Sequence, residues 1–285
     1  MKNKDFAVFI LTHGRPDNVI TKRTLDSRGY TGKIYYIVDD EDDTVDQYRK
    51  NFGAENVIVF DKTDIAERFD EGDNFNDRRA IFYARNACFD IARKLGITYS
   101  MELDDDYNHF GYRVDADGGY VHKGTERLDD LFDALLEYYI NSGIDSLCIS
   151  QSGDFIGGAN SNMFKKKITR KAINSFICST KRQFEFVGRV NEDVNTYTGQ
   201  AAKGKVFLTV AMVSLNQGMT QKNKGGMTEM YIDNGTYVKT FYSVMISPSS
   251  VRVSQMGDKE RRIHHKVLWK HAVPMIISED HKKQD

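Results

Sequence analysis

The sequence lacks several features that would place it in a specialised class of protein. Three prolines in 285 residues and no low-complexity tract leave no linker and no long disordered region. Its three cysteines (Cys88, Cys148 and Cys178) are odd in number and widely spaced, which predicts reduced structural thiols and not a disulfide framework or a zinc site. No apolar run is long enough to span a bilayer, and the run at 6–11 is too short for a signal peptide. We therefore expect a cytoplasmic protein.

An excess of charge of one sign is also missing. The 40 Lys and Arg residues nearly balance the 41 Asp and Glu residues, and the formal net charge is −1. No global basic field therefore indicates nucleic-acid binding, although a local basic groove would suffice for it. A chain of this length with 40% hydrophobic residues is sufficient for one large α/β domain. The oligomeric state stays open.

Apolar strands alternate with amphipathic helices in the first 150 residues. Strands are expected at 6–11, 33–38, 56–60, 97–103 and 144–150, and helices at 17–29, 45–52, 80–95 and 128–139. This alternation predicts a mostly parallel sheet flanked by helices. The acid-rich segment 61–77 is expected to be a loop. The less regular second half is expected to contain helices at 170–175 and 194–202 and a strand at 206–213.

Polar clusters follow three of the expected strands. They are Thr12-His13-Gly14-Arg15, Asp39-Asp40 and Asp104-Asp105-Asp106. Ligands of a doubly wound sheet bind beyond the carboxyl ends of its strands, so these clusters are expected to meet at one binding site.

The three aspartates are candidate metal ligands. Side chains alternate along an extended segment, so Asp104 and Asp106 can share one side while Asp105 points the other way. Two such carboxylates suit Mg²⁺ or Mn²⁺ bound together with phosphate oxygens. An isolated Asp-Asp-Asp is more often a surface turn, but its place after an apolar strand favours a site.

Other charged residues suit a nucleotide. Asp39 and Asp40 can bond a ribose or a base edge, while Arg15, Arg79 and Arg85 can meet a pyrophosphate, although some of these arginines must pair with nearby acids. Glu192-Asp193 begins an expected helix, where capping and a general-base role are equally good interpretations. His264 and His265 are weak candidates to complete the metal site.

The segment Arg85-Asn86-Ala87 through Met101-Glu102-Leu103-Asp104-Asp105-Asp106 resembles the run into the DXD motif of GT-A fold nucleotide-sugar glycosyltransferases. Glu192-Asp193 looks like the later acidic motif of those enzymes. The resemblance implies a GT-A-like, Rossmann-like single domain, with a nucleotide-sugar-binding half at 1–150 and an irregular acceptor-binding half at 151–285.

More narrowly, Leu11 to Arg15 and Val38-Asp39-Asp40 resemble the TET-associated glycosyltransferase group, found largely in phages. This resemblance implies transfer of arabinose or glucose from a UDP-sugar to 5-hydroxymethylcytosine in DNA, in the host cytoplasm. It also implies Mn²⁺ or Mg²⁺ held mainly by Asp106, nucleotide contacts from Thr12, Arg15 and Asp40, and Asp193 as the base of an inverting reaction.

The second half carries local basic segments, among them 165–167, 170–171 and the Gly-rich loop with Lys222 and Lys224. Phosphate contacts from that loop would hold DNA, and Phe155 is a candidate wedge for a flipped base. Three alternatives stay open: a glycosyltransferase for a polysaccharide or small acceptor, a sugar nucleotidyltransferase, and a binding module without catalysis.

Overall fold

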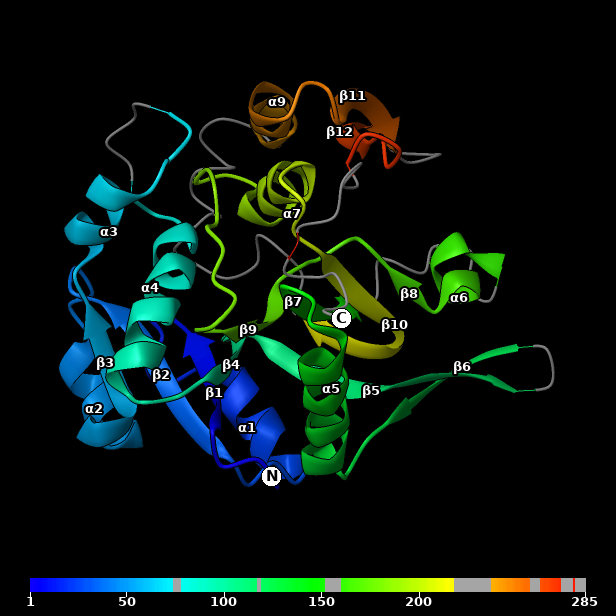
Figure 1. The fold of residues 1–285 in the computed structure, drawn as a ribbon. Coiled ribbons are helices and arrows are strands. Elements are labelled where there is room, and N and C mark those ends of the chain that lie inside the picture. Colours follow the sequence, from blue (N-terminus) through cyan, green and yellow to red (C-terminus); the bar gives the residue numbers. More distant parts are fainter. Residues whose placement is uncertain are drawn as a thin grey trace.

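The computed structural model describes residues 1–73, 78–116, 119–151, 160–217, 237–256, 262–272 and 279, and Figure 1 shows their arrangement. The first part of the chain builds the strands β1 (Phe6–Leu11), β2 (Lys33–Asp39), β3 (Val57–Phe60), β4 (Tyr99–Asp104), β5 (Tyr107–Ala116), β6 (Gly119–Gly124) and β7 (Ser146–Gln151). Its helices are α1 (Ile20–Ser27), α2 (Val45–Phe52), the short 3-10 helix η1 (Ala54–Asn56), α3 (Lys62–Arg68), α4 (Phe82–Lys94) and α5 (Leu128–Ser142).

The second part adds strands to the same sheet and a small unit of its own. In chain order it contains α6 (Asn162–Lys166), β8 (Ile168–Thr169), β9 (Ser175–Ser179), α7 (Glu192–Ala202), β10 (Phe207–Gln217), α9 (Tyr237–Ile246), β11 (Val251–Met256) and β12 (Arg262–Val267). The sheet has the order β3-β2-β1-β4-β9-β7-β10-β5-β6, and β8 pairs with β10. One sheet thus draws its strands from both predicted halves.

The sheet is parallel where it meets the predicted binding edge and mixed elsewhere. β1 pairs in parallel with β2 and β4, and β2 pairs in parallel with β3, whereas β9 is antiparallel to both of its neighbours. Leu11 lies beside Asp104 in the register of β1 and β4. The carboxyl ends of β1, β2 and β4 therefore meet at one edge, which confirms the predicted α/β fold with its flanked, largely parallel sheet.

Both faces of the sheet around β1 are buried, because helices cover each of them. Along β1, Phe6, Val8 and Ile10 pack into one core with α1, α2 and α5, whereas Ala7, Phe9 and Leu11 pack into a second core with α3, α4 and α7. This explains the uninterrupted apolar run of β1, since a strand covered on both sides has no solvent-facing position. The three cysteines are free and buried, as predicted. Within the described ranges, none of the helices combines the length and apolarity needed to cross a membrane.

Three expected elements differ from the structure. The helix expected from residue 17 begins at Ile20, after a turn that includes the hydrogen bond from Asn18 N to Arg15 O. Part of the expected loop 61–77 is α3, which begins because the Asp61 carboxylate caps it by accepting the Asp64 N–H. The helix expected at 170–175 is absent, since Asn174 has a φ of 50° and Ser175 already begins β9.

α9 and the two-stranded ribbon β11–β12 form a separate unit above α7 (Figure 1), here named the α9–ribbon unit. Polar contacts fasten it to α7. Asn191, just before α7, donates to Ser243 Oγ at 2.8 Å, and Thr198 Oγ1 lies 3.1 Å from Ser247 Oγ. The Trp269 ring stacks on Tyr197 of α7 with centroids 5.6 Å apart. The unit therefore lies against the helix that begins with Glu192 and Asp193.

Candidate active site at the carboxyl ends of the parallel strands

The three polar clusters that follow β1, β2 and β4 meet at one edge, here named the donor edge (Thr12–Arg15, Asp39–Asp42 and Asp104–Asp106). Asp105 links the first cluster to the third. Its carboxylate accepts a hydrogen bond from Thr12 Oγ1 at 2.7 Å and one from Arg15 Nη1 at 3.1 Å. Tyr48 of α2 supports the same loop, because its hydroxyl lies 2.7 Å from Thr12 Oγ1 and accepts from Arg15 N at 2.8 Å.

Contrary to the prediction from sequence, the three aspartates do not alternate between the two sides of an extended strand. β4 ends at Asp104, and Asp105 and Asp106 form a turn, so the side chains do not follow the alternation of an extended segment. Asp105 has different partners from Asp104, but it is buried within the donor edge and does not face solvent. Gly14 supplies the left-handed backbone that the loop requires, with a φ of +67°.

Asp39, at the end of β2, is buried between two cationic partners. His13 Nδ1 lies 2.8 Å from its Oδ2, and the buried Lys62 of α3 donates to its Oδ1 at 3.1 Å. Burial opposes ionisation of Asp39, but His13 and Lys62 outweigh it and hold the pKa of this carboxyl below its usual value. The hydrogen bond to Asp39 in turn raises the pKa of His13, which is half exposed.

Asp40 is exposed, and its carboxylate accepts the Lys62 N–H at 2.9 Å. Its outward position leaves the predicted contact with a ribose or base sterically open. Asp42 lies beneath the first loop, where its Oδ2 accepts the Gly14 N–H at 2.7 Å. The first and second clusters are therefore joined through their own side chains before any ligand binds.

Arg85 occupies a different place from the one predicted. Its side chain is fully buried and makes ion pairs with Glu102 at 3.3 Å, Asp104 at 3.0 Å and Glu192 at 3.2 Å. The guanidinium also lies over the ring of Phe176, 5.0 Å from its centroid. A guanidinium enclosed in this way does not reach a pyrophosphate, so the predicted nucleotide contact is wrong and Arg85 instead joins β4 to the start of α7.

One guanidinium does not neutralise three carboxylates. Burial raises the pKa of Asp104 to about 8 and that of Glu102 to about 7, although Arg85 acts in the opposite direction on both. Burial therefore favours the protonated forms of Asp104 and Glu102, and a cation bound beside Asp104 would favour its ionised form. Glu102 is a charged residue within the otherwise apolar strand β4, and it is fully buried. A charged residue inside an apolar strand is the sequence signal that could have predicted this buried ion cluster.

Asp106 has an unused carboxylate oxygen. Its Oδ2 accepts a hydrogen bond from Gln217 at 3.4 Å, whereas its Oδ1 is buried and has no partner in the described part of the chain. Burial, followed by the charge of Asp105, raises the pKa of Asp106 to about 6. Because a buried oxygen without a partner is costly, this atom fits the single protein ligand of a divalent cation that a diphosphate and water also bind.

Glu192 and Asp193 begin α7 but have different surroundings. Glu192 is buried against Arg85, and burial together with the neighbouring Asp193 raises its pKa. Asp193 is only partly buried, and its Oδ1 accepts the Val194 N–H at 2.7 Å. Of the two predicted catalytic acids, Asp193 is the accessible one, and Glu192 is a structural partner of Arg85.

His264 and His265 do not complete a metal site in the structure. No three His, Cys, Asp or Glu side chains among the described residues come close enough to hold an ion. His265 Nδ1 instead lies 3.2 Å from the amide nitrogen of Asn191, and the His264 ring packs on the His265 ring at 4.2 Å. The expectation that these histidines join Asp104 and Asp106 at a metal site stays a prediction. β12 pairs with β11 and contacts α9, and this arrangement places His265 beside Asn191 at the start of α7.

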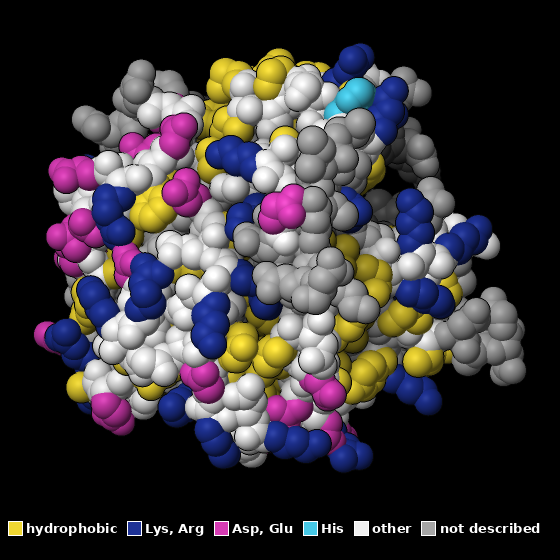
Figure 2. Space-filling model, viewed as in Figure 1, with side chains coloured by type: hydrophobic (Ala, Val, Ile, Leu, Met, Phe, Trp, Pro, Cys, Tyr) yellow, Lys and Arg dark blue, Asp and Glu magenta, His cyan; other side chains and the backbone are white. Residues whose placement is uncertain are grey.

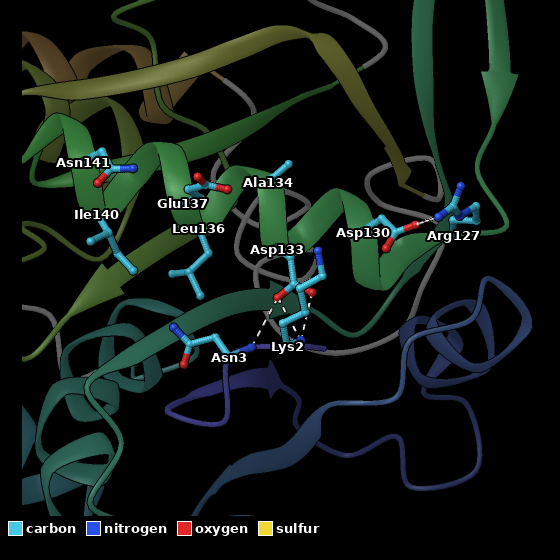
Figure 3. Close-up of a pocket in the computed structure, with 10 residues that line it drawn as sticks. All are labelled: Lys2, Asn3, Arg127, Asp130, Asp133, Ala134, Leu136, Glu137, Ile140 and Asn141. Carbon is cyan, nitrogen blue, oxygen red and sulfur yellow. Dashed lines mark hydrogen bonds and ion pairs between the residues drawn. The ribbon is translucent and has the colours of Figure 1, made fainter.

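Of the remaining predicted site residues, Arg79 alone lies within the described ranges. Arg79 is exposed just before α4, next to Arg78, which pairs with Glu41 at 3.4 Å. Phe155, Lys222 and Lys224 lie outside the described residues. A hollow lined by residues of α5 and by Lys2 and Asn3 (Figure 3) lies near the amino end of β1, away from the donor edge, so it has no part in the site.

The comparisons with known proteins agree with a glycosyltransferase. The model of a family described as TET-Associated Glycosyltransferase matches residues 6–226. No curated protein matches the sequence significantly. Among solved structures, glucosyl-3-phosphoglycerate synthase from Mycobacterium tuberculosis, in complex with Mg²⁺ and UDP, is similar with a TM-score of 0.47 and 9% identity over 92% of this chain and 87% of that chain.

Two further solved structures are similar at comparable scores. TarS 1-349 from S. aureus has a TM-score of 0.40 and 13% identity, covering 73% of this chain and 59% of that chain. A putative nucleotide-diphospho-sugar transferase from Desulfovibrio desulfuricans G20 has a TM-score of 0.42 and 7% identity, covering 84% and 99%. At such scores the family match, and not these structures, carries the functional assignment.

Proposed function

The chain belongs to the TET-associated glycosyltransferase family, and on that premise we propose that it transfers a sugar from a UDP-sugar to the hydroxymethyl group of 5-hydroxymethylcytosine in DNA. Mn²⁺ or Mg²⁺ is the proposed cofactor, arabinose or glucose the proposed sugar, and inversion the proposed outcome at the anomeric carbon. The observation that carries the donor side of this proposal is the unused, buried Oδ1 of Asp106 at the end of β4.

The donor edge fits a nucleoside diphosphate. Asp106 would hold the cation, and a cation bound there would favour the ionised form of the neighbouring Asp104. When bound there, a divalent cation neutralises charge that develops on the departing diphosphate. Asp40 projects outward to meet the ribose or base, while Thr12 and Arg15 shape the loop beneath the nucleotide through Asp105.

Asp193 is the proposed general base. It would accept the proton of the acceptor hydroxyl as that oxygen attacks the anomeric carbon and the bond from this carbon to the diphosphate oxygen breaks. Its partial exposure at the start of α7 supports this role, because the base must reach a substrate from outside. Arg85 pairs with Glu192 and Asp104 and so would fix the start of α7 relative to β4.

The donor side is tested by thermal shift with UDP-glucose and UDP-arabinose, with and without Mn²⁺. We expect one sugar nucleotide to raise the melting temperature, and only when the metal is present. Absence of any metal-dependent shift would contradict the assignment of Asp106. Release of pyrophosphate instead of UDP would identify a nucleotidyltransferase.

The acceptor side is tested by UDP release with DNA that contains 5-hydroxymethylcytosine against unmodified DNA of the same sequence. Release from modified DNA alone supports the proposal, and equal release from both would overturn it. Asp193→Asn should lower turnover about 10²- to 10⁴-fold, the range expected for loss of a general base. Turnover of Asp193→Asn equal to that of the wild type would remove Asp193 from the mechanism.

A further inference from the structure

An exposed aromatic stripe runs along α9. Tyr237, Phe241 and Met245 recur every four residues, and their side chains are 53%, 45% and 61% exposed. Tyr242 and Ser243 on the same helix are buried, so α9 has one face against the protein and one toward solvent. The rings of Tyr237 and Phe241 meet edge to face at 6.4 Å. Three large apolar side chains in a row on a solvent face indicate a binding surface.

The ribbon beside α9 carries exposed cations that pair with no acid among the described residues. Arg252 of β11 lies directly across from Lys266 of β12, and both side chains are exposed. Neither has an ion pair within the described ranges, and like charges directly opposite on a sheet are destabilising. The described residues 237–256 and 262–272 include five Lys and Arg residues and not one Asp or Glu. This pattern fits an anionic partner.

The aromatic stripe and the cations adjoin on the surface. In Figure 2 hydrophobic side chains gather at the upper rim over α9, and His, Lys and Arg side chains follow beside them over the ribbon. The unit is fastened to α7 through Asn191, the residue before Glu192 and Asp193. The α9–ribbon unit therefore lies next to the start of α7, the helix that carries the proposed general base Asp193.

We propose that the α9–ribbon unit binds the acceptor DNA strand, with backbone phosphates on Arg252 and Lys266 and bases stacked on Tyr237 and Phe241. This inference rests on the proposed function, since it assigns where the DNA acceptor of that reaction lies. Exposed aromatic rings next to cations form the surface that single-stranded nucleic acid requires, because every base has a face that stacks and every nucleotide carries a charge. An acidic or apolar protein partner would use only one of these two features.

The binding surface is tested without sugar transfer, by fluorescence anisotropy of a labelled single-stranded oligonucleotide over a range of salt concentrations. Arg252→Ala/Lys266→Ala should weaken binding at low salt. It should also reduce the slope of log affinity against log salt by about 1.4, because two phosphate contacts are lost at about 0.7 each. Tyr237→Ala/Phe241→Ala should weaken binding about five-fold or more and leave the salt slope unchanged.

The matched control is Lys50→Ala/Lys94→Ala, which removes two exposed charges from α2 and α4, far from α9. We expect this control to keep wild-type affinity, salt slope and turnover. All altered side chains are exposed, and equal melting temperatures would confirm folding. The inference would be overturned if Arg252→Ala/Lys266→Ala and Lys50→Ala/Lys94→Ala had equal DNA affinity, or if the wild type did not bind DNA. Either result would assign the surface to another partner. Wild-type binding without sugar transfer to modified DNA would instead overturn the proposed function.

Discussion

The donor edge and the α9–ribbon unit treat charge in opposite ways. At the donor edge, buried charged groups meet partners of opposite sign within the chain, as Arg85 does with three carboxylates and Lys62 does with Asp39. In the α9–ribbon unit, Arg252 and Lys266 face each other in solvent with no acid in the described part of that unit. The first region is assembled before its ligand arrives, whereas the described part of the second region carries positive charge without an acidic partner of its own.

The two regions also shift the pKa values of histidines in opposite directions, because burial dominates at His265 and the hydrogen bond to Asp39 dominates at His13. His13, beside Asp39 and Asp42 at the donor edge, has a raised pKa. His265 has a pKa lowered to about 3 by burial and by the positive neighbours His264, Lys239 and Lys171. The surroundings therefore favour the charged form of His13 and the neutral form of His265.

The largest expected effect follows from changing Asp106, whose buried Oδ1 has no partner among the described residues. Asp106→Asn keeps the shape of the side chain but removes the proposed metal ligand, so turnover should fall about 10³-fold or more. The melting temperature should stay equal or rise, because a buried charge is removed. Turnover and thermal unfolding measured on the same sample check both. Unchanged turnover would contradict the assignment of Asp106 as the metal ligand. A fall in turnover that is accompanied by loss of folding would also contradict it.

Arg85→Met tests whether the stability of the protein depends on the ion pairs of Arg85 with the buried carboxylates at and beside the donor edge. Three buried carboxylates would lose their shared cation, and the free energy of unfolding should fall by about 3–5 kcal/mol. Chemical denaturation measures it. Arg252→Met in the α9–ribbon unit is the matched control, and it should change stability by less than about 0.5 kcal/mol. Similar losses in both variants would remove the contrast between the two regions.

Lys62→Met is a milder version of the same test. Asp39 would lose one of its two cationic partners and keep His13, so the free energy of unfolding should fall by about 1–3 kcal/mol. The backbone N–H of residue 62 would still donate to Asp40, which leaves the start of α3 in place. Denaturation curves for Lys62→Met and Lys50→Met give the comparison. A loss no greater than that of Lys50→Met would show that Asp39 needs no second cation.

The smallest expected effect is a pH dependence of opposite sign in the two regions. Around pH 5 the unfolded chain protonates His265, whereas the folded chain does not, so the stability that His265 contributes is lost as pH falls below about 6.5. His13 has a raised folded pKa, so its contribution is present at low pH and lost as pH rises through that pKa. Melting temperatures of His265→Gln and His13→Gln at pH 5 and 7.5 check the signs. A pH dependence of the same sign in both variants would contradict the opposite pKa shifts of His13 and His265.

The sequence predicts the parallel half well because its signals are local. Apolar runs such as 6–11, interrupted by polar clusters, require strands buried on both faces, and this is what β1 shows in its two cores. The helix expected at 170–175 failed because pairing of β8 with β10 and the left-handed backbone of Asn174 override helical spacing. Nor did local pattern identify Tyr48, which supports Thr12 and Arg15 from 33 or more residues away.

By itself, the sequence determined the alternation of strands and helices, the reduced cysteines and the polar clusters at the strand ends, since each depends on neighbouring residues. Only the tertiary structure decided which of those polar residues face a ligand. It enclosed Arg85 and Glu192 within a buried ion cluster, left Asp106 with an unused oxygen, and placed His265 on Asn191. The physical reason is that a charged side chain takes its role from its burial and its partners, and both are set by contacts between segments far apart in the chain.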